Sequence, residues 1–357
     1  MTGRWRLHGL KQSYFTGKLE GYLRVKGVPF DFVEMDTADF RACGRATGVN
    51  QMPQLEGSDG TWLTDTTAIL RRFEAERPEP ALQPTGPAAA FLSLFLEDAF
   101  DEWLWRPALY YRWAFHEDSR LMGRQLGRTI LGDLPGPLAL RALFMRHRQQ
   151  RTFLREDGVT RETAPLIEAQ YSETLALLEP ILARRPFLFG ERPVAADFGL
   201  FGPMFRHFFS DPTPAAILRE TAPNVMAWVA RLWALTPQAA AAAACPDEAP
   251  DDLDPLLRLA AHEHLTELVA NLEAVIDRRD KAVFDLRGAR WTTPVSPYCA
   301  ACLIDLRTLY AALTAADRAT VDARLGPASA QLRGPIVELP ATTVPRAGQR
   351  PKNHRWA

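Results

Sequence analysis

With 357 residues, the chain is too long for one ordinary domain and long enough for two or three. Its formal net charge of −1 gives no reason to expect nucleic acid or an anionic membrane as a partner. Four cysteines in this length argue against a secreted scaffold held by disulfides. Residues 1–10 lack the apolar core of a signal peptide, and no run reaches about 18 uncharged apolar residues. We therefore expect a soluble, cytoplasmic protein.

The first 80 residues alternate between strand and helix patterns. The predicted elements are a strand at 5–9, a helix at 13–25, a strand at 30–33, a hairpin formed by 53–55 and 62–64, and a helix at 65–76. Gly27 ends the first helix, and Pro78 and Pro80 follow the last one. This order, βαβ followed by ββα, is that of a thioredoxin-like domain.

Beyond residue 80 the strong patterns are all helical. We expect helices at 91–111, 163–184, 195–209 and 225–235, then a linker, and further helices at 253–283, 297–313 and 317–332. The tail from residue 340 is Pro-rich and basic, and we expect it to be disordered. The predicted domains are thus 1–80 (thioredoxin-like), 87–238 (all-α), 250–335 (helical extension) and 340–357 (disordered tail).

Two short motifs stand out in the first domain. Asn50-Gln51-Met52-Pro53-Gln54-Leu55 places a proline directly before a short strand, and Asp65-Thr66 opens a helix ten residues later. Upstream, a strand leads through a polar loop to Ser13 at the start of a helix. Taken in this order, the motifs resemble the amino-terminal domain of glutathione transferases, and the likeness extends over roughly residues 5–235.

The resemblance implies that Ser13 activates the glutathione thiol as the catalytic residue. A thiol has a pKa of about 8.5, and lowering it by about two units requires ~2.7 kcal/mol. One hydrogen bond to a charged group supplies ~1.5–3 kcal/mol, and a helix amino terminus adds ~0.3–1 kcal/mol. One hydroxyl therefore suffices. Two alternatives stay open: Ser13 only caps its helix, or Tyr14 donates the hydrogen bond.

The same resemblance assigns the binding residues. It implies a cis Met52-Pro53 bond, with the Met52 backbone pairing with the cysteinyl part of glutathione as an added strand does. Asp65 would face the γ-glutamyl ammonium, Thr66 would bind the α-carboxylate at the helix start, and Gln51 would hold the glycyl end. Alternatively, Pro53 serves only the fold, and Asp65 or Thr66 is an ordinary helix cap.

The helical part shows one departure from the family pattern. The family has Ser or Thr three residues before an Asp at a helix start, where the two form a capping box. Here Val194 occupies the hydroxyl position and Asp197 remains. The missing half of the box should cost ~1 kcal/mol of local stability.

Two other features are weaker. Cys299 and Cys302 form a CxxC pattern at a predicted helix start, and we interpret both as buried small side chains, not as a redox or zinc site. The aromatic residues around Tyr110 and Trp113 belong either to the core or to the pocket for a hydrophobic co-substrate.

Together these features predict a glutathione S-transferase-like enzyme with glutathione as co-substrate and no metal. It would activate the thiol for attack on a small hydrophobic electrophile. The resemblance also implies a homodimer, with neither nucleic acid nor membrane as partner. Two alternatives stay open: a non-catalytic binding or assembly protein of the same fold, and a glutathione-dependent isomerase or dehalogenase.

Overall fold

A four-stranded sheet forms the amino-terminal part of the computed structural model, which describes residues 4–339. Its strands are β1 (Trp5–Gly9), β2 (Phe30–Glu34), β3 (Gln54–Glu56) and β4 (Trp62–Thr64), in the order β2-β1-β3-β4. β1 runs parallel to β2, with Leu7 opposite Phe32, and antiparallel to β3, with Leu7 opposite Leu55. The helices α1 (Tyr14–Lys26), α2 (Thr37–Thr47) and α3 (Thr66–Glu76) complete this part. The thioredoxin-like order predicted from the sequence is confirmed.

Local capping explains where the helices beside the sheet begin and end. Ser13 caps α1, because its Oγ accepts a hydrogen bond from the Thr16 N–H at 3.3 Å. The helix ends at Gly27, whose φ of 70° is a left-handed conformation that glycine adopts at no steric cost. Asp65 caps α3 with its own φ at 70°, a value uncommon outside glycine. The Met52-Pro53 bond is cis, as predicted.

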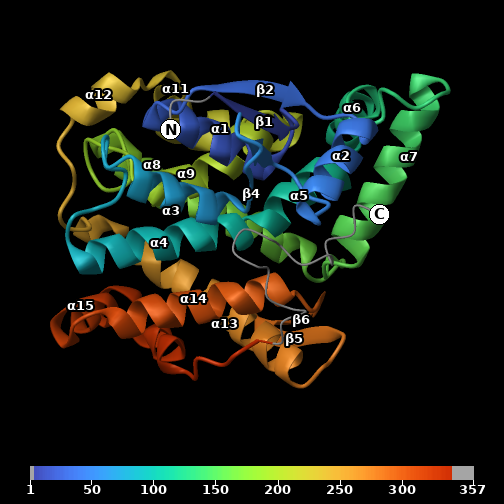
Figure 1. The fold of residues 1–357 in the computed structure, drawn as a ribbon. Coiled ribbons are helices and arrows are strands. Elements are labelled where there is room, and N and C mark those ends of the chain that lie inside the picture. The colour runs from blue at the N-terminus through green and yellow to red at the C-terminus, as the bar shows by residue number, and fades with distance from the viewer. Residues whose placement is uncertain (1–3, 340–357) are drawn as a thin grey trace.

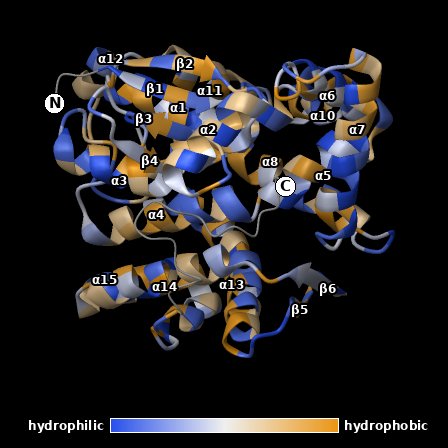
Figure 2. Cartoon of the chain, turned by 45° about the vertical axis from the view of Figure 1, so that its right-hand side comes forward, coloured by the Kyte–Doolittle hydropathy of each residue, from blue (hydrophilic) through white to orange (hydrophobic). Residues whose placement is uncertain are grey.

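The second part of the chain is helical. It comprises α4 (Pro87–Glu102), α5 (Trp105–Ala114), α6 (His116–Arg128), α7 (Leu138–Gln150), α8 (Ala164–Arg184), α9 (Ala195–Pro203), α10 (Pro212–Thr221), α11 (Pro223–Ala234) and α12 (Pro237–Ala242), with π-helical turns at Arg151–Arg155 and Met204–Phe208. α9 packs against both α4 and α1, and so joins the helices to the sheet part. Hydrophobic and hydrophilic residues alternate along the helices in Figure 2.

The carboxy-terminal extension forms a further layer against α4 (Figure 1). It consists of a 3₁₀ turn at Asp251–Leu253, α13 (Asp254–Ile276), β5 (Lys281–Leu286), β6 (Ala289–Pro294), α14 (Pro297–Ala312), α15 (Ala315–Leu325) and a 3₁₀ segment at Gly326–Arg333. α13, α14 and α15 all contact α4. Buried side chains of the extension, such as Leu257 and Leu303, belong to the same apolar core as Phe95 of α4. The extension is therefore built onto the rest of the protein through a shared core.

Two predicted helices are wrong in their extent. The segment 91–111 is two helices, because Pro107 has no N–H to donate to the carbonyl of Trp103, and that carbonyl accepts from Gln170 Nε2 at 3.0 Å instead. The segment 253–283 is helical only to Ile276, and a β-hairpin follows it. Its two-residue loop, Arg287 and Gly288, has φ of 53° and 76°, as a type I′ turn requires.

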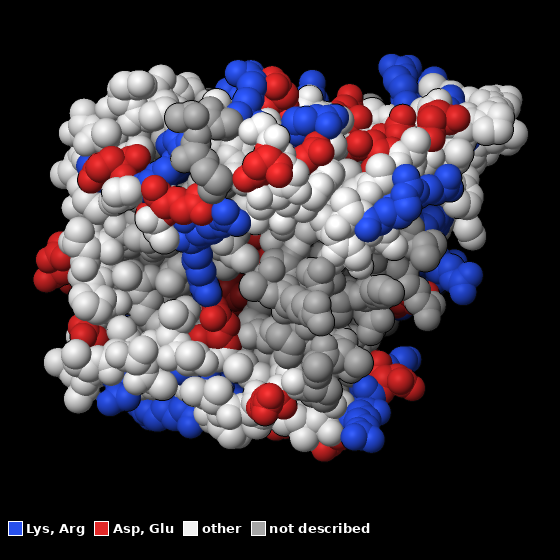
Figure 3. Space-filling view, viewed as in Figure 1, with Lys and Arg blue, Asp and Glu red and all other residues white. Residues whose placement is uncertain are grey.

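Other elements differ from the prediction in smaller ways. The helices α2, α6, α7, α10 and α12 have no counterpart among the predicted helices, and α12 overlaps the predicted linker. The segment 195–209 changes from α-helix to a π-helical turn after Pro203, and the segment 317–332 changes from α-helix to a 3₁₀ segment after Leu325. The tail from residue 340 lies outside the described residues. Within residues 4–339, no helix is both long and apolar enough to cross a membrane. The face in Figure 3 mixes acidic and basic side chains, in keeping with the net charge near zero.

Candidate functional site

A small hollow lies where the segment before β3 meets the start of α3. Its lining residues are Phe15, Gln51, Met52, Pro53, Thr64, Asp65 and Thr66. The structure thus brings together all five residues that the sequence predicts to bind glutathione. Phe15 and Thr64 were not predicted, although their positions beside Ser13 and Asp65 in the sequence were a signal that could have found them.

The Met52 backbone leaves two polar groups available beside the hollow. Within residues 4–339, neither its N–H nor its C=O has a hydrogen-bond partner. The loop around it is held by Gln54, whose Nε2 donates to the carbonyls of Val49 and Gln51 at 2.8 and 3.0 Å. Because backbone groups that are buried without a partner cost free energy, this pair is suited to hydrogen-bond an extended peptide.

The start of α3 offers groups of both polarities. Thr66 is 2% exposed, and its Oγ1 has no hydrogen-bond partner among the described residues. The Asp65 carboxylate accepts from the Thr67 N–H at 3.1 Å and lies 3.4 Å from the Tyr298 hydroxyl, both through Oδ1. The remaining oxygen, Oδ2, has no partner within residues 4–339. An unpartnered buried hydroxyl at a helix amino terminus suits a ligand carboxylate, and the Asp65 oxygen suits an ammonium.

A buried ionic cluster connects the start of α3 to α1 and α4. The Lys18 ammonium of α1 is buried against the carboxylates of Glu97 and Asp101 on α4, and Thr67 Oγ1 donates to Glu97 at 2.6 Å. Burial disfavours the charged Lys18, but the two carboxylates outweigh it and raise the Lys18 pKa. Burial raises the pKa of Asp101 well above its usual range despite the attraction of Lys18, and nearby Glu97 adds to the rise. This cluster ties α1, α3 and α4 together.

Ser13 lies on the loop before α1 and is not among the residues that line the hollow. Its Oγ accepts the capping hydrogen bond with a lone pair, so the hydroxyl proton stays available for donation. The loop is held by Arg112, which donates to the Gln12 carbonyl at 2.6 Å and pairs with Asp211 at 2.7 Å. The Tyr14 hydroxyl, by contrast, is buried and donates to the Phe100 carbonyl, so it is engaged away from the hollow.

An aromatic cluster continues from the hollow. Phe15 stacks on Trp105 with ring centroids 5.6 Å apart, and Trp105 meets Phe153 edge-on at the same distance. All three rings are partly exposed. Trp113, in contrast, is 1% exposed, and the Tyr110 hydroxyl donates to Glu168 at 2.6 Å. The core interpretation therefore holds for Trp113.

The two cysteines of the CxxC pattern are buried or partly buried thiols. Burial raises the pKa of both well above its usual range, and the carboxylates of Glu102 and Asp98 act in the same direction. The Cys299 thiol donates to Glu102 at 3.6 Å. Neither cysteine has the low-pKa environment of a reactive thiolate.

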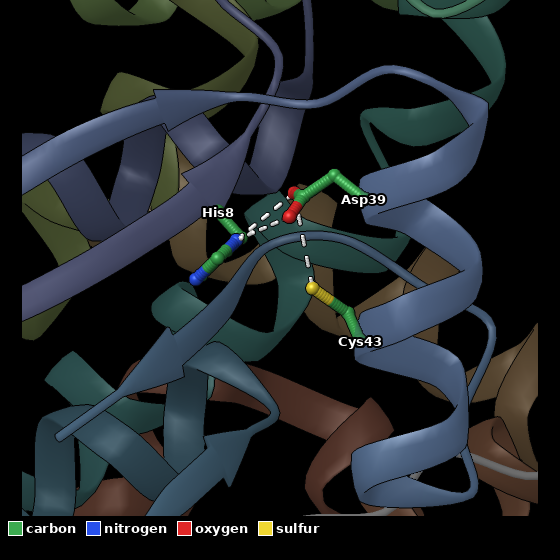
Figure 4. Close-up of side chains that lie close together, drawn as sticks. All are labelled: His8, Asp39 and Cys43. Carbon is green, nitrogen blue, oxygen red and sulfur yellow. Dashed lines mark hydrogen bonds and ion pairs between the residues drawn. The ribbon is translucent and has the colours of Figure 1, made fainter.

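Among residues 4–339, His8, Asp39 and Cys43 form the group whose donor set suits a metal. His8 on β1 points toward Asp39 and Cys43 on α2 (Figure 4), and their ligand atoms lie within 4.8 Å of one another. Hydrogen bonds already explain this proximity. His8 Nδ1 lies 2.9 Å from Asp39, Nε2 lies 3.2 Å from Glu56, and the Cys43 thiol lies 3.9 Å from Asp39. These contacts join α2 to the sheet, and burial raises the pKa of Cys43 to about 12.

Comparison with known proteins decides the family. A model of the glutathione S-transferase amino-terminal domain matches residues 7–81, and a model of the glutathione S-transferase carboxy-terminal domain matches residues 154–231. This chain belongs to the glutathione S-transferase family. None of the curated proteins matches this transferase-family chain.

Solved structures similar to this family member have low identities and TM-scores. A glutathione S-transferase from Xanthobacter autotrophicus Py2 is 24% identical over 65% of this chain and 93% of that chain, with a TM-score of 0.38. The β-etherase LigF from Sphingobium sp. strain SYK-6 is 20% identical over 64% and 95%, with a TM-score of 0.45. A glutathione S-transferase from Methylobacterium radiotolerans, in complex with glutathione sulfonate, is 20% identical over 69% and 97%, with a TM-score of 0.41. Likenesses at this level carry no argument about the reaction.

Proposed function

We propose that this protein binds glutathione in the hollow and activates its thiol. The observation that carries the proposal is the buried Thr66 hydroxyl, which has no partner within residues 4–339 and lies beside Asp65 at the start of α3. The unpaired Met52 N–H and C=O supply the complementary strand-like contacts. In this arrangement Thr66 binds the α-carboxylate, Asp65 the ammonium, Met52 the cysteinyl backbone and Gln51 the glycyl end.

Ser13 is the proposed catalytic residue. Its hydroxyl donates a hydrogen bond to the glutathione sulfur and so lowers the thiol pKa, while the released proton goes to water. Capping of α1 and donation to sulfur are compatible, because the cap uses an oxygen lone pair and the donation uses the hydroxyl proton. The thiolate then attacks a carbon atom of a small hydrophobic electrophile. A carbon–sulfur bond forms as the bond from that carbon to the leaving group breaks.

The electrophile has an aromatic surface available next to the hollow. Phe15 is one lining residue, and the partly exposed rings of Trp105 and Phe153 extend the surface from it. We propose that this surface, and not Trp113, contacts the electrophile. Holding both reactants side by side supplies orientation, and no covalent enzyme intermediate is needed.

Two other functions use the same residues. A glutathione-dependent isomerase or dehalogenase differs only in the fate of the adduct formed by the attack, and turnover without consumption of glutathione would favour the isomerase. A non-catalytic binding or assembly protein would retain the fold and dispense with thiolate formation. A homodimer and a cytoplasmic location remain part of the proposal; the four free cysteines fit a reducing compartment.

Calorimetric titration of glutathione into the wild type and the Ser13→Ala variant tests the proposed function. We expect both to bind, and only the wild type to show the ultraviolet absorbance of a bound thiolate. Because the substitution also removes the α1 cap, Thr314→Ala is the control, since Thr314 caps α15 in the same way through the Asp317 N–H at 3.2 Å. An absence of binding heat with the wild type would reject glutathione as ligand.

A further inference from the structure

One side chain of the extension reaches the residues that line the hollow. Tyr298, in the first turn of α14, is 7% exposed, and its hydroxyl lies 3.4 Å from Asp65 Oδ1. The two residues are 233 positions apart in the chain. The extension therefore contacts the carboxylate to which the proposed function assigns the γ-glutamyl ammonium.

The start of α14 is fixed in place by α13. Asn271 of α13 accepts from the Ser296 N–H and donates through Nδ2 to the Ser296 carbonyl, each at 2.7 Å. Ser296 in turn caps α14 by accepting from the Cys299 N–H at 3.2 Å. Because Asn271 is 4% exposed, water competes little for these bonds. Tyr298 therefore lies in the chain between Ser296 and Cys299, and these hydrogen bonds restrain both residues.

A second contact holds α14 directly to α3, the helix that Asp65 caps. Arg71 of α3 and Asp305 of α14 form a bidentate ion pair, with nitrogen–oxygen distances of 3.1 and 2.6 Å. The planar guanidinium and carboxylate groups fix direction as well as distance in such a pair. Contacts of α14 with α13 and with α3 therefore both bear on the position of Tyr298 relative to Asp65.

The arrangement restricts the Asp65 carboxylate. Oδ1 receives the Thr67 N–H at 3.1 Å and faces the Tyr298 hydroxyl at 3.4 Å, so both donors act on the same oxygen. Oδ2 has no partner in the described part of the chain. Two donors on one oxygen oppose rotation of the carboxylate and keep the second oxygen for a ligand cation.

We infer that Tyr298 is a positioning residue for glutathione: the extension orients Asp65 through the Tyr298 hydroxyl and so completes the pocket for the γ-glutamyl group. This inference rests on the proposed function, because it concerns the same hollow. It assigns the extension a part in ligand binding, with α14 as the element that acts.

The test compares two ligands across two variants by calorimetric titration. The ligands are glutathione and the glutathione analogue that lacks only the α-amino group. Tyr298→Phe removes the hydroxyl and keeps the ring. Tyr310→Phe is the matched control, because the Tyr310 hydroxyl donates to Asp322 at 2.8 Å, within the extension. We expect Tyr298→Phe to weaken glutathione binding about threefold to tenfold and to leave binding of the analogue unchanged.

Each other outcome overturns the inference in a distinguishable way. A wild type that does not bind glutathione rejects the proposed function and the inference together. Equal glutathione affinities of the wild type and Tyr298→Phe reject the inference alone. Equal weakening of both ligands would mean a general structural role. If Tyr298→Phe does not fold, Asp305→Asn replaces it: release of α14 from Arg71 should produce the same selective loss, and unchanged selectivity rejects the inference.

Discussion

The ammonium of Lys18 is buried against the carboxylate of Glu97, and Thr67 Oγ1 contacts both groups, at 3.2 Å from Lys18 and 2.6 Å from Glu97. Asp101 adds a second carboxylate to the same ammonium. The cluster contacts α3 through Thr67, the residue after Asp65 and Thr66, so the start of α3 is supported by charges that water does not reach.

Lys18→Met should destabilise the protein strongly. Removal of one partner from a buried ion pair costs about 3–5 kcal/mol, because the other charge stays buried without compensation. Urea unfolding measures the loss, and Lys281→Met is the control, since Lys281 is exposed at the start of β5. Adding Glu97→Gln to Lys18→Met should recover part of the stability. A loss below about 1 kcal/mol would show that the cluster does not support α3 as argued.

Thr66→Val should weaken glutathione binding and spare the stability, whereas Thr67→Val should mainly lower the stability. The Thr66 hydroxyl lacks a partner in the described chain, so a methyl group of similar shape should leave the stability unchanged or higher. Loss of its hydrogen bond to the ligand carboxylate should weaken glutathione binding about tenfold or more.

Thr67→Val removes a hydroxyl that bonds to Glu97, so it should cost about 1–3 kcal/mol of stability. Thr67→Val should lower the glutathione affinity less than Thr66→Val does. Thermal unfolding and calorimetric titration of both variants measure the contrast. Destabilisation by Thr66→Val with unchanged affinity would mean that Thr66 is structural.

The five residues predicted to bind glutathione line one hollow because the determinants of that part of the fold are local. Their role in binding stays a prediction. Proline before a strand, a hydroxyl before a helix and an Asp-Thr pair at a helix start each act on residues within four positions. Ser13 and Asp65 are found as caps for this reason. The Asp197 half of the capping box is present too, since its Oδ2 accepts from the Val194 N–H at 3.0 Å.

The features that the sequence did not predict depend on contacts between residues far apart in the chain. Tyr298 meets Asp65 across 233 positions, and no local pattern indicates that pair. The predicted long helix at 91–111 is interrupted between Glu102 and Trp105, where Gln170 of α8 donates to the Trp103 carbonyl that Pro107 leaves unpaired. Val194 is fully buried, so its packing offsets part of the predicted cost of the missing cap hydroxyl.

The proposed homodimer could use an exposed apolar surface on α7 of the described structure. Leu140, Leu143 and Phe144 are 62, 61 and 58% exposed and share one helix face. We expect the wild type to have dimer mass in light scattering and Phe144→Glu to shift it toward monomer, because a charge would then be buried in the interface. Ile276→Glu is the control, since Ile276 is 53% exposed at the end of α13. A wild-type monomer would contradict the dimer.

Titration of Asp157 should make the free energy of unfolding depend on pH in the acidic range. Its Oδ2 is buried without a hydrogen bond and lies 3.9 Å from Arg106. Burial, with repulsion from Glu267 and Glu102, raises the Asp157 pKa from 3.8 to about 6, against the attraction of Arg106.

In the unfolded chain the carboxyl loses its proton near its ordinary value, so between about pH 4 and pH 6 the folded state binds more protons than the unfolded state. The contribution of Asp157 is therefore fully present below pH 4 and is lost as the pH rises through 6. Asp157→Asn removes this contribution, so the difference in unfolding free energy between variant and wild type should move in favour of the variant from pH 4 to pH 7. Urea unfolding of both proteins at several pH values measures it; two parallel pH profiles would mean that Asp157 titrates at its ordinary value.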